Sequence, residues 1–182
     1  MLALTDQPQS TRAWAIGARG EEKLAQALGE VDGIRVLNDR KVKGTRRNID
    51  HVVIAPAGVF VVDAKNYSGM VQIRDRGGFF RRDERLYVGG RDRSADAEKL
   101  GWQVEAVVDA LQSAGVDPLP SVTPVLCFID AEWPLFRAPK SYLGVRLESI
   151  RSLRALVVSD EQLDTQAVEG FTRLLAAALP AK

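Results

Sequence analysis

Three charged residues interrupt an otherwise apolar stretch near the middle of the chain. Residues 48–69 read NIDHVVIAPAGVFVVDAKNYSG, in which Asp50 opens one run rich in Val and Ile, and Asp63 and Lys65 close the next. Carboxylates held close together repel one another unless a cation or a raised pKa compensates them. Oxygen ligands of this kind suit Mg²⁺ or Mn²⁺, so we interpret the stretch as a candidate site for a divalent metal.

The residues between the two runs determine how the acids approach each other. Residues 56–58, PAG, have the composition of a short turn, and the flanking runs predict a β-hairpin. A hairpin closed by this turn places Ile54 opposite Val59 and, counting outwards, Asp50 opposite Asp63. A register that differs by one residue would leave the two acids one step apart.

Strand periodicity places Asp63 and Lys65 on one face of the sheet and Ala64 on the other. Lys65 could then orient or deprotonate a water at the metal, or stabilise negative charge that develops during hydrolysis. The alternative is that Asp63 and Lys65 form a solvated pair at the end of a strand, an interaction worth well under about 1 kcal/mol. The opposed Asp50 favours the metal site.

A helix before the hairpin supplies a third carboxylate. Residues 13–31 have helical periodicity, and Glu21 falls at the edge of the apolar stripe whereas Glu22 points to solvent. We therefore expect Glu21 to face the body of the protein and to join Asp50 and Asp63. The inward stripe consists of Ala13, Ile16, Gly17, Gly20, Leu24, Ala27, Leu28 and Val31.

Two glycines lie on that stripe, although each disfavours a helix by about 1 kcal/mol relative to Ala. We expect Gly17 and Gly20 to let the helix pack closely against the sheet. The approach of a substrate backbone, or glycines that are merely tolerated, are the alternatives.

Beyond the hairpin, apolar periodicity and turn residues predict further strands and helices. We expect strands over 70–74, 79–82, 86–88, 122–129 and 142–147. We expect helices over 94–113 and 149–157, and a last helix opened by a capping-box pattern, Ser159 with Gln162. The strand 122–129 is apolar almost throughout, which suits an interior position. This order predicts an α/β protein with one domain, 12–180, after an N-terminal tail, 1–11, in which helices flank a mixed β-sheet with a central hairpin.

Composition restricts the class of protein. The 182 residues are 46% hydrophobic and 27% charged, which suits one globular domain. No run approaches the roughly 18 apolar residues that span a bilayer, and the N-terminus lacks the apolar core of a leader, so we expect a cytoplasmic protein. One Cys and one His cannot form the usual zinc site, and the same scarcity argues against a zinc finger, an HNH nuclease and a Cys-His protease. Cys127, within VLCFI, is expected to be a buried thiol.

Basic residues gather on both sides of the hairpin in the sequence. The net charge is only +1, but residues 35–47 hold six basic residues and one acid, and residues 74–93 hold seven arginines and four acids. Clustered Arg and Lys beside an acidic centre suit a phosphate backbone that approaches a metal, although solvated loops have the same composition. We select Lys43, Arg46 and Arg47 as candidate contacts to nucleic acid.

Three segments together resemble a known family. They are GARGE (17–21), NIDHVV (48–53) and GVFVVDAKNYSG (58–69), and they look like the nuclease-related (NERD) domain, a branch of the PD-(D/E)XK nuclease superfamily. The resemblance covers about residues 12–112. It implies a restriction-endonuclease-like fold and Mg²⁺-dependent hydrolysis of phosphodiester bonds in DNA.

The same resemblance implies roles for individual residues. Glu21, Asp50, Asp63 and the main-chain carbonyl of Ala64 would hold Mg²⁺, and Lys65 would assist hydrolysis.

Two further residues have a less direct match to the family. Many such nucleases carry a Gln on a later helix, and Gln103 is the candidate here. The surrounding EKLGWQ is not a clean match, so we expect a solvated side chain. His51 follows Asp50 as in the family but points to the other strand face, so we expect a structural, hydrogen-bonding histidine.

Functions from different classes stay open at this point. The first is a metal-dependent DNA nuclease. The alternative is a non-catalytic nucleic-acid-binding or accessory module on the same scaffold, in keeping with the modest net charge. A third is a structural or protein-interaction domain with a charged sheet edge. A homodimer is compatible with each.

Overall fold

A six-stranded mixed sheet forms the middle layer of the protein. The computed structural model describes residues 9–78, 81–159 and 162–182, with the backbone alone over 9–16. In spatial order the strands are β1 (Arg35–Lys41), β2 (Asn48–Ala55), β3 (Gly58–Lys65), β7 (Val122–Phe128), β10 (Val145–Glu148) and β9 (Ser141–Tyr142). β2 pairs antiparallel with β1 and β3, whereas β7 pairs parallel with β3 and β10.

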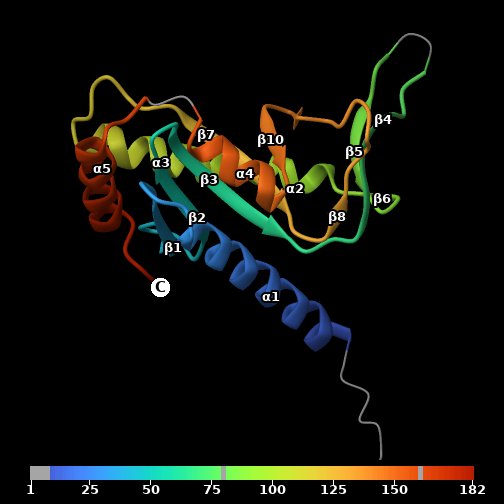
Figure 1. Cartoon of the computed structure of the whole chain (residues 1–182), viewed down its shortest axis with the longest axis horizontal. Coiled ribbons are helices and arrows are strands. Elements are labelled where there is room, and N and C mark those ends of the chain that lie inside the picture. Colours follow the sequence, from blue (N-terminus) through green and yellow to red (C-terminus); the bar gives the residue numbers. More distant parts are fainter. Residues whose placement is uncertain (1–8, 79–80, 160–161) are drawn as a thin grey trace, which may run out of the picture.

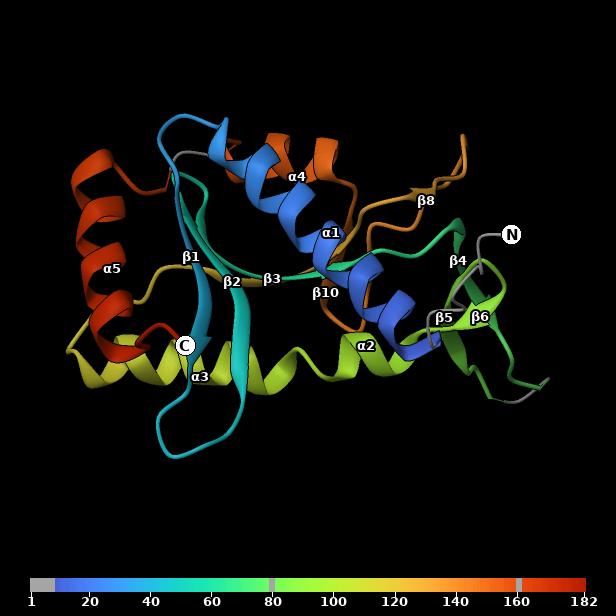
Figure 2. The same ribbon diagram turned by 90° about the horizontal axis from the view of Figure 1, so that it is seen from below.

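Helices cover both faces of this sheet (Figure 2). α1 (Gln9–Gly29) and α4 (Ile150–Val157) lie on one face, and α2 (Ser94–Glu98) and α3 (Gly101–Ser113) lie on the other. α5 (Thr165–Ala178) packs against α3 and β1. Two apolar clusters result, one between the sheet and α3 with α5, and one between the sheet and α1 with α4. No helix in the described part of the chain is long and apolar enough to cross a membrane.

A smaller sheet continues from the end of β3 (Figure 1). Its order is β6 (Arg91–Asp92), β5 (Glu84–Val88), β4 (Gly69–Asp75) and β8 (Ala131–Glu132). Its buried residues Val71, Leu86 and Val88 join the apolar cluster under α3. The end of β3 is therefore the junction of the two sheets.

The hairpin register is the one predicted, with Ile54 opposite Val59. The interior position of β7 is also confirmed, because β7 lies between β3 and β10. The α/β fold, with a mixed sheet and a central hairpin flanked by helices, is confirmed and is consistent with a restriction-endonuclease-like fold.

The strand expected over 79–82 is not the partner of β4. Residues 79 and 80 lie outside the described residues, and β4 pairs with β5, Asp75 opposite Glu84. The carboxylate of Asp75 accepts hydrogen bonds from the backbone N–H groups of Gly77 and Asp83, at 2.8 and 2.9 Å, which closes a longer loop. Gly77 and Gly78, which separate the two expected strands, therefore belong to this longer loop between β4 and β5.

Three further boundaries differ from expectation. The helix expected over 94–113 is two helices, α2 and α3, separated by a short break at Lys99 and the buried Leu100. The strand expected over 142–147 is divided into β9 and β10, because Leu143 and Gly144 both adopt positive φ and form a turn. A capping box occurs at Ser149 and not at Ser159.

The last helix begins later than predicted, because Asp164 caps it by accepting a hydrogen bond from the N–H of Ala167.

The first helix begins at Gln9, within the predicted tail, of which residues 1–8 lie outside the described residues. On the predicted stripe of α1, Leu24 and Leu28 are buried and Gly17 is exposed. The side chains of Ala13 and Ile16 lie outside the described residues.

Candidate metal centre

The hairpin brings Asp50, Asp63 and Lys65 close together at one end of β3. The last pair of the β2–β3 ladder is His51 opposite Val62, and Asp50 and Asp63 are the next residues outwards, near enough for the charge of Asp50 to act on Asp63. Val62 packs in the cluster under α1. Because side chains alternate along a strand, Asp63 and Lys65 lie on the opposite face, which α3 covers.

Asp63 and Lys65 form a buried ion pair. Asp63 is 4% exposed, and Lys65 Nζ lies 2.7 Å from Asp63 Oδ1. The contact is short enough for a charge-assisted hydrogen bond, and Oδ1 has no further partner among the described residues. Burial raises the pKa of Asp63, although Lys65 opposes that shift. The alternative of a solvated pair at a strand end is therefore wrong.

The ammonium of Lys65 is held in its charged form. Burial lowers its pKa, but the negative charges of Asp63 and Asp96 outweigh that effect and leave the pKa raised. In this state Lys65 is a cation that can stabilise negative charge and is poorly suited to accept a proton.

Glu21 approaches the pair from the other layer. Its side chain is exposed on α1, and partial burial together with the charges of Asp50, Asp39 and Asp63 raises its pKa. Burial also raises the pKa of Asp50, although Lys65 opposes this shift. The acids are thus electrostatic neighbours, but in the described residues no three Asp, Glu, His or Cys side chains are close enough to hold a metal ion as they stand. Joint ligation by Glu21, Asp50 and Asp63 stays a prediction.

A close contact of α1 places Glu21 at this end of β3. A Cβ atom on Gly20 would lie 3.0 Å from Asn66 Cβ, so only a glycine lets the helix approach without displacing its neighbour. A Cβ on Gly17 would meet nothing within 4 Å. The predicted close packing is therefore confirmed for Gly20 and wrong for Gly17.

His51 has a structural environment. It is 4% exposed, and its Nδ1 lies 2.8 Å from Asn38 Oδ1. Burial lowers its pKa, although the nearby Asp39 opposes the shift. A neutral, hydrogen-bonded imidazole on the face opposite Asp50 matches the expectation of a structural histidine.

Gln103 is buried, so the expected solvated side chain is wrong. It lies on the inward stripe of α3 with Val107 and Leu111, and it is 6% exposed. Its Oε1 has no hydrogen-bond partner within the described part of the chain. Gln103 thus lies in the layer that covers Asp63 and Lys65, and its contact with nucleic acid stays a prediction.

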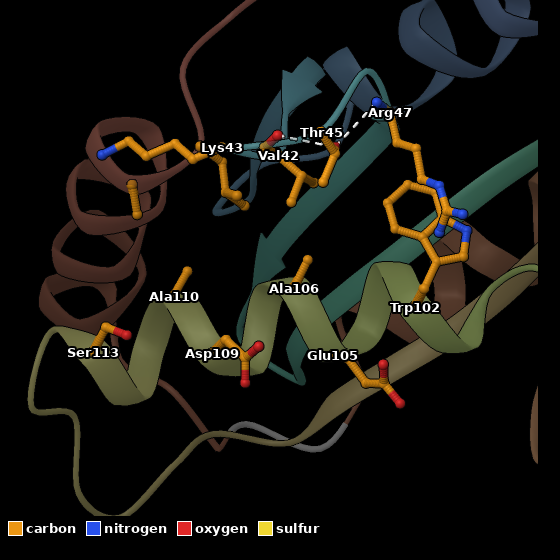
Figure 3. Close-up of a pocket in the computed structure, with 12 residues that line it drawn as sticks. Val42, Lys43, Thr45, Arg47, Trp102, Glu105, Ala106, Asp109, Ala110 and Ser113 are labelled. Atoms are coloured by element: carbon orange, nitrogen blue, oxygen red, sulfur yellow. Dashed lines mark hydrogen bonds between the residues drawn. The ribbon is translucent and has the colours of Figure 1, made fainter.

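The predicted nucleic-acid contacts lie in the exposed loop between β1 and β2. Arg47 stacks on the ring of Trp102 at 5.2 Å from the ring centroid. Lys43 and Arg47 line a groove of about 480 Å³, whose α3 side carries Glu105 and Asp109. Figure 3 shows Arg47 reaching toward Trp102 of α3, whereas the side chain of Lys43 extends away from Trp102. The groove carries both signs of charge, and Arg46 is exposed beside it.

Sequence reasoning missed a group beside Lys65. The Tyr67 hydroxyl donates to the buried Asp96 Oδ2 at 3.0 Å, and the Arg93 guanidinium lies over the Tyr67 ring at 3.8 Å from its centroid. Tyr67 falls within the KNYSG segment that carries the family resemblance, which was the available signal. Asp39, whose charge acts on Glu21 and Asp50, was counted only within a basic stretch.

Comparisons with known proteins identify a family for most of the chain. The chain is 28% identical over 112 residues to a protein of Bacillus anthracis described as uncharacterised, a match that covers 56% of this chain and 53% of that protein. The chain thus spans about half the length of that relative. No solved structure gives a significant match. The family model described as "Nuclease-related domain" (NERD) matches residues 16–129, which include the whole hairpin and Glu21. The chain therefore belongs to the nuclease-related domain family, within the PD-(D/E)XK superfamily.

Proposed function

We propose that the protein is a metal-dependent nuclease that hydrolyses phosphodiester bonds in DNA. The observation that carries the proposal is the buried Asp63 at the end of the hairpin. Burial and the charge of Asp50 raise its pKa, and Lys65 is the cation beside its Oδ1. Membership of the nuclease-related domain family supports the same chemistry.

The donor atoms fit Mg²⁺ or Mn²⁺ in kind. Glu21, Asp50 and Asp63 offer carboxylate oxygens, the Ala64 carbonyl offers a further oxygen, and Asp63 Oδ1 is a buried oxygen beside the ammonium of Lys65. The exposed side chain of Glu21 would complete the set by turning toward the other two. A bound divalent cation would supply Lewis-acid stabilisation of the phosphate oxygens.

The protein itself would contribute charge and position. Lys65 is held as an ammonium beside Asp63, where it can stabilise the negative charge of the phosphate during attack by water. The loop residues Lys43, Arg46 and Arg47 would neutralise backbone phosphates of the DNA, with Gln103 as a further contact.

A cleavage assay tests this proposal. Supercoiled, linear and single-stranded DNA are incubated with Mg²⁺, Mn²⁺ or EDTA, and Asp63→Ala and Lys65→Ala should each abolish metal-dependent cleavage. Asp32→Ala and Lys140→Ala remove exposed charges elsewhere and serve as matched controls. Cleavage by the Asp63 and Lys65 variants at the wild-type rate would show that the nuclease assignment is wrong.

A binding or accessory module is the second candidate, because the acids do not form a complete ligand set as they stand. Calorimetric titration with Mn²⁺ separates the two functions. Absence of metal uptake, together with retained DNA binding, would favour the accessory module. A cytoplasmic location and a homodimer remain predictions, and light scattering of the purified protein tests the latter.

A further inference from the structure

A pocket with positive charge lies directly after Lys65. It has a volume of about 320 Å³, and its lining comes from the segment that follows β3 and from the turn and strand after β5. The lining residues are Asn66, Tyr67, Ser68, Val88, Gly89, Arg91 and Arg93. Both formal charges in this set are positive, so the pocket suits an anion.

The two arginines have charge available for a ligand. Within the described residues, neither Arg91 nor Arg93 has a carboxylate at ion-pair distance. Nε of Arg93 is buried and has no hydrogen-bond partner there either. A guanidinium binds phosphate oxygens with two parallel N–H groups, which a buried unpaired donor favours.

The walls of the pocket are held in place before any ligand binds. Tyr67 is fixed by Asp96 at its hydroxyl and supports Arg93 on its ring. On the other side of the pocket, the backbone at Gly89 packs directly against the backbone at Gly69. A Cβ on Gly69 would lie 2.6 Å from the Cα of Gly89, so a side chain would not fit between them. Both glycines have positive φ, which an L side chain rarely adopts.

The pocket adjoins the candidate metal centre. Asn66 directly follows Lys65 in the chain, and the charges of Lys65 and Tyr67 influence each other's pKa. Neighbouring phosphates on one strand of B-DNA are separated by about 3.4 Å of helix rise. A strand whose phosphate lies at Lys65 would therefore bring a nearby phosphate of the same strand to this pocket.

We propose that Arg91 and Arg93 form a subsite for a second, uncleaved phosphate of the DNA strand that lies at Lys65. This inference rests on the proposed nuclease function for the identity of the strand. The arginines bind and position the substrate, while the reacting phosphate is at the metal centre.

Binding of labelled DNA in EDTA tests the subsite without turnover. Arg91→Gln and Arg93→Gln should each weaken affinity about five-fold at 0.15 M salt and lower the salt slope by about 0.9 for duplex, as expected for one lost phosphate contact. Arg74→Gln is the matched control, since Arg74 also stacks on a tyrosine ring, at 4.9 Å from the centroid of Tyr87, but lies outside the pocket. Circular dichroism melting checks each fold, and if Arg93→Gln is unfolded, the exposed Arg91 carries the test.

Oligonucleotides with one uncharged methylphosphonate identify the bound phosphate. At one position the substitution should weaken wild-type binding about five-fold and should have no further effect in Arg93→Gln or Arg91→Gln. Affinities of both variants equal to that of Arg74→Gln, or undiminished methylphosphonate effects in them, would overturn the subsite. If the protein cuts DNA but the methylphosphonate effect does not depend on Arg91 or Arg93, the subsite is refuted and the nuclease function is not. If the effect depends on these arginines but the protein never cuts DNA, hydrolysis is refuted and the subsite is not.

Discussion

Replacement of Asp50 by Asn should stabilise the metal-free protein and remove most of the stabilisation that Mn²⁺ provides. The carboxyl of Asp50 lies near Asp63, Glu21 and Asp39, and burial raises its pKa. A carboxylate with a raised pKa destabilises the folded state at neutral pH, because the folded protein binds the proton more tightly than the unfolded chain does. An amide of nearly the same shape removes that penalty.

Bound Mn²⁺ should stabilise wild type more than Asp50→Asn, because the metal needs the negative charge that the variant lacks. At a Mn²⁺ concentration a hundred times its Kd, binding to the folded state stabilises wild type by about 2.7 kcal/mol. For a domain of this size that corresponds to a rise in Tm of about 5–11 °C. If the variant binds Mn²⁺ a hundred-fold more weakly, the same concentration adds only about 0.4 kcal/mol.

Thermal unfolding followed by circular dichroism, in EDTA and in Mn²⁺, measures both effects. The sign with pH follows from the raised pKa of Asp50: the penalty in wild type grows as pH rises from the unfolded to the folded pKa, and it is complete at neutral pH. The advantage of Asp50→Asn in EDTA should therefore vanish in acid. Asp109→Asn, an exposed acid on α3, is the control and should change neither quantity. A lower Tm for Asp50→Asn in EDTA, with an undiminished gain in Mn²⁺, would refute the reasoning.

Other features of the structure make independent predictions. Gly17→Ala should raise the free energy of unfolding by up to about 1 kcal/mol, because the added Cβ would meet open space. Gly20→Ala should lack this gain, because its Cβ would be crowded against Asn66. Urea unfolding of the two variants measures both effects, and equal gains would contradict the close contact at Gly20. Burial raises the pKa of the Cys127 thiol to about 12, so Ellman's reagent at mildly alkaline pH should react only as fast as the chain unfolds, and rapid labelling of folded protein would be inconsistent with that burial. Arg47→Gln should weaken DNA binding about five-fold at 0.15 M salt if Arg47 contacts one phosphate. Fluorescence anisotropy of labelled DNA measures the affinity. No salt-dependent loss of affinity would show that the loop between β1 and β2 does not contact DNA through Arg47.

Local sequence was sufficient for the hairpin and for the partners within it. A short turn between two apolar runs permits few registers, and a wrong register would turn the buried residues to the opposite face. That Asp50, Asp63 and Lys65 lie close together could therefore be counted from the turn. The interior position of β7 likewise followed from its apolar composition alone.

Contacts between distant segments decided the remaining features. Gln103 is buried because the helix breaks at Lys99 and Leu100, and α3 then packs Gln103, Val107 and Leu111 at helical spacing against the sheet. The sequence around Gln103 left this packing open. Whether Gly20 or Gly17 makes the close contact depended on where Asn66 lies after β3.

The sequence by itself thus determined the hairpin, its acids and the family, because these depend on short-range spacing and on residue type. Only the tertiary structure decided that Asp63 is buried against Lys65, that Glu21 approaches from another layer, and that Tyr67 meets Arg93 and Asp96. The physical reason is that burial and the mutual influence of charges depend on distances through space, and two sheets and two helical layers must pack before those distances exist.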